Sequence, residues 1–325
     1  MLVIISCLIT LIILYKTIDW LLRLPTVDGI SSKYVLVTGC DSGFGYQLAQ
    51  QLEKKGFYVF ATCLTASGEH KLNSVTSERV KTIRMDVTSS SNIKEVAEMV
   101  KKFLPENTGL WGLVNNAGVT GVGGPCDWHT KKHYSDCFDV NVFGMIESTI
   151  AFLPLIKISQ GRIVNVSSVM GRFAVSGPYS VSKFAVEAFS DGLRIVMRCF
   201  GVSVSIIEPG FFRTEMVTYD NIVKPLDQVW KNLNTEIQEE YGEEFFENLK
   251  SNTAKALELC SDKTYLVVDA MVHALTSVRP MTRYSVGWDA KLVWIPLSLL
   301  PSCICDPIHL YLNNFSLPKI MQKRQ

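Results

Sequence analysis

Residues 34–55 read YVLVTGCDSGFGYQLAQQLEKK, and this stretch decides the fold. A run of β-branched and aromatic residues at 34–38 leads directly into glycines and then into a helical segment at 46–55. This order of strand, glycine turn and helix brings backbone N–H groups at a helix N-terminus close to a pyrophosphate. We therefore expect dinucleotide contacts from Thr38, Gly39, Asp41, Ser42, Gly43, Phe44 and Gly45.

Strands and helices alternate along the following part of the chain, as a doubly wound parallel sheet requires. Runs rich in Val, Ile and aromatic residues predict further strands at residues 58–62, 80–85, 110–114, 162–168 and 202–207. Apolar residues at helical spacing predict helices at 91–104 and 133–153, the second with the polar Asn141 among apolar neighbours. The expected fold class is α/β with a doubly wound parallel sheet.

The residues that follow each strand are candidate nucleotide contacts, because ligands bind at the carboxyl ends of the strands in such sheets. The second strand ends at Cys63, Leu64 and Thr65, beside the expected adenosine ribose. These residues include neither the acid that selects NAD nor the base that accommodates NADP, and the missing base favours NAD. The next two strand ends contribute Asp86, Val87, Asn115, Ala117 and Gly118.

Tyr179 and Lys183 form a second candidate site, because residues four apart on a helix lie on one face. A positive charge near a phenol favours the phenolate, so Lys183 is expected to lower the pKa of Tyr179 toward working pH. The preceding strand ends in Ser167 and Ser168, which places hydroxyls at the same edge of the sheet. A Tyr-x-x-x-Lys pair alone is more often a surface pair, but these surroundings favour alcohol–ketone chemistry.

Together these motifs resemble the short-chain dehydrogenase/reductase family. The matching residues are Thr38-Gly39-x3-Gly43-x-Gly45, Asn115-Asn116-Ala117-Gly118, Asn141, Ser168, Tyr179-x3-Lys183 and Pro209-Gly210-x3-Thr214. More narrowly, GCDSGFG at 39–45, LWGLV at 110–114, SSVMGR at 167–172, VEAFSD at 186–191 and GWDAK at 287–291 resemble the subfamily of microsomal retinol dehydrogenases and 17β-hydroxysteroid dehydrogenase type 6. The resemblance covers nearly everything after residue 30.

The resemblance implies a seven-stranded Rossmann-like sheet, NAD as cofactor, and oxidation of retinols or 3α/17β-hydroxysteroids at the endoplasmic reticulum (microsomal) membrane. It makes Tyr179 the general acid/base, with Lys183 lowering its pKa and binding the ribose hydroxyls. Ser168 then orients the substrate oxygen, and Asn141 holds a proton-relay water. Further cofactor contacts implied by the resemblance are Pro209, Gly210 and Thr214. The expected partners are a lipophilic retinoid or steroid and a membrane, with a homodimer left open.

The segment between Arg172 and Tyr179 departs from that subfamily, because it is one residue shorter and has Ser-Gly-Pro at 176–178 in place of a run of glycines. Counting back from Tyr179 selects Ser167 as the working serine, whereas matching from Val169 onward selects Ser168. We expect Ser168, because a shift within the strand would turn over every buried side chain, while a loop absorbs a deletion easily. The alternative function is not enzymatic: a cofactor-binding lipid carrier or scaffold without turnover. The presence of Tyr179, Lys183 and the serine argues against it.

Composition excludes some functions. The 32 basic and 31 acidic residues leave no electrostatic footprint for nucleic acid, and the nine scattered cysteines without a CxxC pair indicate free thiols. Cys303, Cys305, Asp306 and His309 are spaced for a metal site, but ordinary apolar packing is the favoured interpretation. We expect no metal.

The N-terminal residues 1–24 are predicted to be an uncleaved membrane anchor, since residues 2–15 are almost continuously apolar and no cleavage site follows. Lys16, Arg23 and Lys33 follow the apolar run and weakly favour a cytosolic catalytic domain. Residues 30–325 are expected to form one domain, with a cofactor-binding core at 30–210 and a substrate cleft at 211–325. In the cleft, residues 217–260 are predicted to be a helical lid, and residues 292–312 an apolar, proline-broken tail.

Overall fold

One parallel sheet of seven strands organises the computed structural model, which describes residues 2–312 and 318–322. The strands lie in the order β3-β2-β1-β4-β5-β6-β7. Their bounds are β1 (Tyr34–Val37), β2 (Tyr58–Cys63), β3 (Val80–Arg84), β4 (Gly112–Asn115), β5 (Arg162–Val166), β6 (Ser203–Pro209) and β7 (Arg283–Val286). The six predicted strands and the Rossmann-like topology are confirmed, and the strand order reverses between β1 and β4, where such folds bind ligands.

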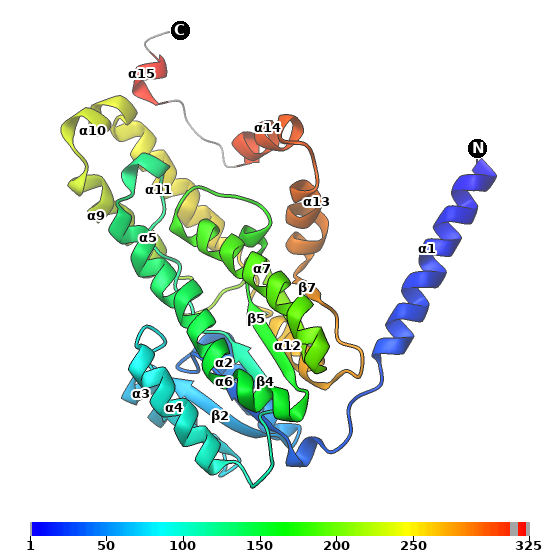
Figure 1. The fold of residues 1–325 in the computed structure, drawn as a ribbon. Coiled ribbons are helices and arrows are strands. Elements are labelled where there is room, and N and C mark those ends of the chain that lie inside the picture. Colours follow the sequence, from blue (N-terminus) through cyan, green and yellow to red (C-terminus); the bar gives the residue numbers. More distant parts are fainter. Residues whose placement is uncertain (1, 313–317, 323–325) are drawn as a thin grey trace.

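Helices cover both faces of the sheet (Figure 1). One face buries apolar side chains of α2 (Gly43–Lys54), α3 (Ala66–Asn73) and α12 (Tyr265–Thr276). The other face buries those of α4 (Ser90–Phe103), α6 (Met145–Ser159) and α7 (Pro178–Met197). Because both faces are covered, the central strands β1, β2 and β4 are buried along nearly their whole length rather than in alternation.

The helix predicted at 133–153 is longer and is interrupted. It begins as α5 (Lys131–Phe138), widens into a π-helical turn, η3 (Asp139–Gly144), and continues as α6. This Lys131–Ser159 run is long and apolar enough to suit a membrane span. Since 44% of its most apolar window is buried, it is also the kind of helix that fills a protein core. Its π-helical turn contains Asn141, and such turns are frequent at functional sites.

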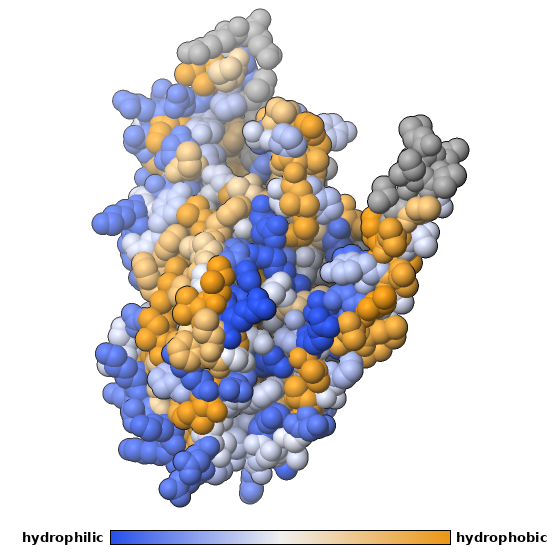
Figure 2. Space-filling view, turned by 45° about the vertical axis from the view of Figure 1, so that its right-hand side comes forward, coloured by the Kyte–Doolittle hydropathy of each residue, from blue (hydrophilic) through white to orange (hydrophobic). Residues whose placement is uncertain are grey.

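The N-terminal helix α1 (Leu2–Arg23) extends away from the sheet (Figure 1), and the coloured part of its surface in Figure 2, nearer the sheet, is largely apolar. Its base is fixed to the segment that joins α12 to β7. Val27 N donates to Thr276 O at 2.8 Å, Val278 N donates to Pro25 O at 2.9 Å, and the Ser277 hydroxyl donates to Arg23 O at 2.8 Å. The junction is therefore held by backbone contacts on both sides.

The C-terminal third is mostly helical, as predicted for residues 217–260. Its helices are α8 (Tyr219–Ile222), α9 (Lys224–Asn232), α10 (Thr235–Tyr241), α11 (Glu243–Glu258), the π-helix η6 (Ala290–Trp294), α13 (Ile295–Ser298), α14 (Ser302–Leu312) and α15 (Lys319–Gln322). Trp128, in the short 3-10 helix η2 (Cys126–Trp128), is buried against Trp230, Phe245 and Phe246 of α9 and α11. This aromatic cluster attaches the helical layer to the loop after β4.

The remaining short turns are 3-10 helices. Their bounds are η1 (Ile30–Ser32), η4 (Val169–Gly171) and η5 (Arg198–Phe200). Among them, η4 comes two residues after β5, and Ser168 is its N-cap residue.

Candidate active site

The glycine turn after β1 has a backbone path that side chains would block. Gly39 and Gly43 have φ angles of 69° and 58°, which L-residues rarely adopt. A Cβ on Gly45 would lie 2.3 Å from Gly39 O and 2.5 Å from the Asn116 amide nitrogen. The turn therefore has no space for a side chain at Gly45, and its backbone conformation favours glycine at positions 39 and 43.

The N-terminus of α2 suits a phosphate group. Ser42 is the N-cap residue but makes no capping hydrogen bond with its side chain, so the first N–H groups of α2 are not capped by that side chain. Thr214 lies over this turn, since a Cβ on Gly43 would be 3.6 Å from the Thr214 Cβ. The buried Thr214 hydroxyl has no hydrogen-bond partner within the described structure. A buried unpaired hydroxyl beside an open helix N-terminus fits the phosphates and amide of a dinucleotide.

The turn after β4 is fastened to the end of β1. The Thr38 hydroxyl accepts hydrogen bonds from the N–H groups of Asn116 and Ala117, each at 3.0 Å. The Asn115 side chain points inward, because its amide nitrogen donates to Thr149 at 2.9 Å and to Asn165 at 2.8 Å. Only backbone atoms and the Ala117 methyl group are therefore left to approach a cofactor.

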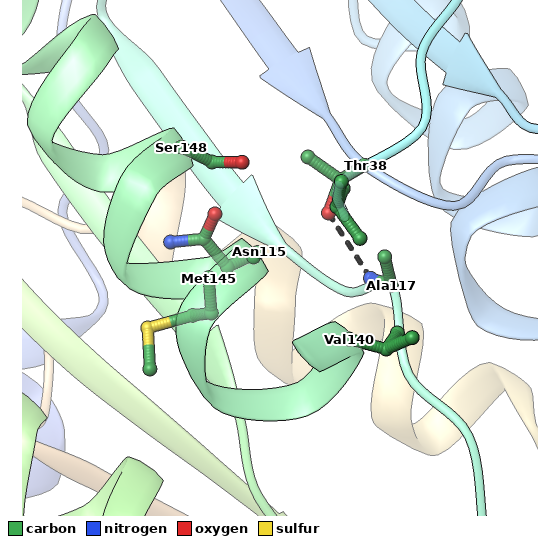
Figure 3. Close-up of a pocket in the computed structure, with 8 residues that line it drawn as sticks. Thr38, Asn115, Ala117, Val140, Met145 and Ser148 are labelled. Carbon is green, nitrogen blue, oxygen red and sulfur yellow. Dashed lines mark hydrogen bonds between the residues drawn. The ribbon is translucent and has the colours of Figure 1, made fainter. Parts of the chain in front are cut away.

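A narrow pocket opens between β1, β4 and α6, and it brings together four of the residues expected to bind the cofactor (Figure 3). They are Thr38, Val87, Asn115 and Ala117. Two polar atoms that line the pocket, the buried Ser148 hydroxyl and the Asn115 amide oxygen, have no hydrogen-bond partner among the described residues. Gly144 permits this arrangement, because a Cβ on it would lie 2.7 Å from Val87 O. At the end of β3, Asp86 Oδ1 accepts from the Thr88 N–H at 2.8 Å.

An acidic side chain stands at the end of β2, although no acid follows that strand in the sequence. Asp41 reaches across from the glycine turn, and its carboxylate accepts from the N–H groups of Leu64 and Thr65, each at 2.8 Å. Gly68 makes room for it, since a Cβ there would lie 2.4 Å from Asp41 Oδ1. The sequence argument missed this contact, because it looked for the acid after the strand rather than in the preceding turn.

The tail motif at 287–291 has a structural role at the end of β6. The Asp289 carboxylate accepts from the Phe211 N–H at 2.8 Å. Gly210 is required for this contact, since a Cβ on it would lie 2.2 Å from both carboxylate oxygens of Asp289. Pro209 and Gly210 are thereby held at the carboxyl edge of the sheet, beside the end of β5.

Ser168, Tyr179 and Lys183 meet at the end of β5. The Ser168 hydroxyl accepts from the Met170 N–H at 3.2 Å, and the Ser168 side chain acts on the Tyr179 phenol by lowering its pKa. The Lys183 ammonium donates to Val166 O at 2.9 Å and lies 5.6 Å from the centre of the Tyr179 ring. Ser167 faces away, with its hydroxyl 3.5 Å from Lys183 O.

The ionisation of this pair differs from the expectation. Burial raises the pKa of Tyr179 to about 12, more than the hydrogen bond with Ser168 lowers it. Burial also lowers the pKa of Lys183 to about 8. The protein alone thus keeps the phenol protonated, because desolvation of the phenolate outweighs the effect of a lysine that is itself desolvated.

Asn141 connects η3 to the loop after β4. Its amide oxygen accepts from the Val119 N–H at 2.8 Å, and its amide nitrogen donates to Ser182 at 2.9 Å and to Val119 O at 2.9 Å. Cys137 also lies here, 3.3 Å from the same amide nitrogen. The sequence argument did not single out Ser182 or Cys137, since their relation to Asn141 depends on how α5 packs on α7.

Comparison with known proteins places this geometry in a family. The model of the family described as short chain dehydrogenase matches residues 33–223. The chain belongs to the short-chain dehydrogenase family. The matched range includes the glycine turn, the turn after β4, Asn141 and the Ser168–Tyr179–Lys183 group.

The curated relatives cover nearly the whole chain. It is 45% identical over 310 residues to the Bos taurus protein named 17-beta-hydroxysteroid dehydrogenase type 6, which covers 95% of this chain and 96% of that protein. It is 44% identical over 283 residues to Rattus norvegicus retinol dehydrogenase 7, covering 87% of this chain and 89% of that protein. The expected subfamily resemblance is confirmed.

Solved structures share the fold. A short-chain dehydrogenase from Streptomyces avermitilis is 27% identical, with a TM-score of 0.66 over 87% of this chain and 96% of that chain. A Burkholderia phymatum short-chain dehydrogenase/reductase in complex with NAD is 21% identical, with a TM-score of 0.65 over 82% of this chain and 92% of that chain. A Burkholderia cenocepacia enzyme in complex with NADP is 22% identical, with a TM-score of 0.63 over 87% of this chain and 98% of that chain.

Proposed function

We propose that the protein is an NAD-dependent oxidoreductase that interconverts an alcohol and a carbonyl on a lipophilic substrate. The substrate is a retinol, oxidised to retinal, or a 3α/17β-hydroxysteroid, oxidised to a ketosteroid. The observation that carries this proposal is the meeting of Ser168, Tyr179 and Lys183 beside the glycine turn. The names of the relatives, as hydroxysteroid and retinol dehydrogenases, support the substrate classes.

The glycine turn and Lys183 would hold NAD, which would supply the hydride acceptor and a positive charge that favours the Tyr179 phenolate. As the phenolate, Tyr179 removes the hydroxyl proton during oxidation, and as the phenol it returns that proton during reduction. Ser168 donates a hydrogen bond to the substrate oxygen, and the Lys183 ammonium stabilises the phenolate and binds the ribose hydroxyls. Asn141 holds a water that relays the proton. This mechanism requires the Ser168 hydroxyl to lie near both the Tyr179 hydroxyl and the substrate oxygen. The position of Ser168, between β5 and α7, is consistent with that requirement.

The choice of NAD over NADP rests on Asp41. Its carboxylate lies against the backbone of Leu64 and Thr65, at the strand end where the adenosine ribose is expected. A negative charge there attracts the ribose hydroxyls and repels the additional phosphate of NADP. No basic side chain stands at 63–65 to offset it.

The lipophilic substrate is proposed to enter between the helical layer at residues 217–260, acting as a lid, and the C-terminal tail. Phe173, in the loop after η4, packs on Trp294 at 5.1 Å and on His309 at 4.7 Å between ring centres. Phe211 packs on the same Trp294 at 5.4 Å. These rings supply an apolar wall next to the residues that follow Ser168 and Gly210.

Residues 1–24 are proposed to anchor the enzyme in the endoplasmic reticulum membrane. The 22-residue helix α1 is long enough for this, at about 1.5 Å of rise per residue, and its described side chains include exposed Leu11, Ile13 and Leu14. A homodimer is proposed through η3, α6 and α7, in which Phe143, Ile150 and Phe184 are exposed.

One assay tests the proposed activity. Purified protein in detergent is mixed with NAD or NADP and with a panel of retinols and androstanediols, and the appearance of reduced nicotinamide is followed. We expect turnover with NAD and at least one of these substrates. Nucleotide binding without turnover on any of them would favour the lipid carrier or scaffold.

The variant Tyr179→Phe makes that assay specific, because the ring remains while the transferable proton is removed. We expect normal NAD binding and a loss of turnover of about 10²–10⁴-fold. The binding is measured by isothermal calorimetry on the same preparations. Near-native turnover in this variant would contradict the assigned mechanism.

A further inference from the structure

A buried charge cluster lies behind the candidate site, where α7 meets β6 and β7. Arg283 of β7 pairs with Glu187 and Asp191 of α7 and, at 3.1 Å, with Glu208 of β6. Glu208 also pairs with Arg172, the residue after η4, at 3.0 Å. The side chains of Glu187 and Glu208 are only 7% and 1% exposed. Two buried carboxylates are thus held by the guanidinium groups of Arg283 and Arg172, and burying these charges costs free energy that their pairing must offset.

Glu187 connects this cluster to the candidate catalytic residues. It follows Lys183 by one turn of α7, and Ser167, just after β5, lowers the pKa of its carboxyl group. Gly171 packs into the same corner, since a Cβ on it would lie 2.7 Å from the Ser167 hydroxyl and 3.0 Å from Glu187 Cγ. The turn that carries Ser168 and the helix that carries Lys183 therefore meet at Glu187.

The charges around Lys183 are few. Apart from Tyr179 and Glu187 on its own helix, the titratable group that faces it is Cys137 on α5. Burial lowers the pKa of Lys183, while the nearby Cys137 and Glu187 raise it. Around Glu187, burial raises the carboxylate pKa, and the Ser167 contact lowers it. Glu208 raises it further, and Arg283 lowers it.

We propose that Glu187 is a positioning residue of the active site. Its carboxylate, fixed by Arg283, joins the Ser168 end of β5 to the Lys183 turn of α7 and favours the charged form of the Lys183 ammonium. The effect of Glu187 on turnover rests on the proposed function. The effect of its charge on the protonation of Lys183 does not, because that can be measured in the protein without substrate.

Two substitutions separate this role from simple stabilisation. Glu187→Gln removes the charge near Lys183 with little change of shape. Asp191→Asn removes another carboxylate that pairs with Arg283, one turn farther along α7, and it is the matched control because Asp191 does not face Lys183. Glu187→Asp restores the charge. The protonation of Lys183 is followed in full-length protein by ¹³C NMR of labelled lysine, assigned with Lys183→Arg, and kcat and KM are measured against pH.

We expect Glu187→Gln to move the titration of Lys183 and the alkaline limb of kcat toward lower pH by roughly one unit, which at a fixed alkaline pH is about tenfold in kcat. Glu187→Asp should restore most of this shift, and Asp191→Asn should leave both profiles in place even if it lowers Tm. A Glu187→Gln protein with a lowered Tm and unmoved Lys183 titration would overturn the proposal. A shifted titration in a protein without turnover on any substrate would instead contradict the proposed function.

Discussion

Ser167 and Ser168 are neighbours at the end of β5, yet their hydroxyls face different surroundings. Ser168 acts on the Tyr179 phenol, whose pKa it lowers, whereas the Ser167 hydroxyl lies 3.5 Å from Lys183 O and lowers the pKa of Glu187. The strand keeps its pairing with β6 up to Val166, and Ser167 N donates to Ile207 O at 2.8 Å. This regular pairing agrees with the prediction that the shorter segment before Tyr179 is accommodated in the loop and not in the strand.

This geometry predicts unequal effects of two similar substitutions. Ser168→Ala should lower kcat by about 10²-fold, because an oriented hydrogen bond to the substrate oxygen is lost in the transition state. Ser167→Ala should lower kcat only a few-fold, which is roughly 1 kcal/mol or less of transition-state stabilisation. Steady-state kinetics of both variants, with Tm as a check on folding, provide the comparison. A larger loss in Ser167→Ala would show that Ser167 is the working serine.

Lys183 gives a prediction on pH. Because burial lowers its pKa to about 8, the ammonium is present below this pH and is lost as the pH rises through it. A neutral lysine makes weaker hydrogen bonds to the ribose, so NADH affinity should fall roughly tenfold between pH 7 and pH 9.5. Fluorescence titration of NADH at each pH measures this. Lys183→Met should bind weakly at every pH, and an equal pH dependence in that variant would assign the effect to another group.

The secondary-structure elements that depend mainly on the local sequence, above all the strands, were predicted well. All six predicted strands are present within a few residues of their bounds, because buried parallel strands require continuous apolar runs that are visible in the sequence. The π-helical turn at Asn141 was not predicted, since one extra residue in a helix leaves the apolar spacing almost unchanged.

The site residues that the sequence could not reveal are those that depend on contacts between distant segments. Asp41 lies 23 residues before its partner Leu64, and Arg283 lies 96 residues after Glu187. The raised pKa of Tyr179 was missed for a related reason. The spacing of Tyr179 and Lys183 gives their separation on a helix, but the extent of burial around them is a property of the whole packed domain.

The end of β2 gives a prediction on nucleotide choice. The enzyme should use NAD with a higher kcat/KM than NADP, and Asp41→Asn should reduce that ratio by roughly tenfold, because the negative charge beside the ribose is removed. Leu64→Arg, at an exposed position on the same strand end, should reduce it further by pairing with the phosphate. Kinetics with both nucleotides give the ratio. A wild-type preference for NADP would contradict the role of Asp41.

At the scale of the whole molecule, α1 and the catalytic domain are joined by a short, fixed connection. Thr26 forms an isolated antiparallel bridge with Ser277, and the Arg23 guanidinium pairs with Asp19 and donates to Arg279 O at 2.9 Å. The contacts of Thr26 and Val27 lie outside residues 1–24. Removal of residues 1–24 should therefore leave the catalytic domain folded.

The proposed anchor then has a direct test. The intact chain should remain in the membrane pellet after washing with alkaline carbonate, because about 20 apolar residues in a helix suffice to cross the hydrocarbon layer. Deletion of residues 1–24 should move much of the protein to the supernatant while turnover on a detergent-solubilised alcohol continues. The control is Leu11→Lys with Leu14→Lys, which keeps the length of α1 but places two charges among its exposed apolar residues, and it should be released to a similar extent. Complete release of the intact chain would contradict a spanning anchor. Retention of both altered proteins would move the attachment to the apolar tail at α13 and α14, where Leu299 and Leu310 are exposed.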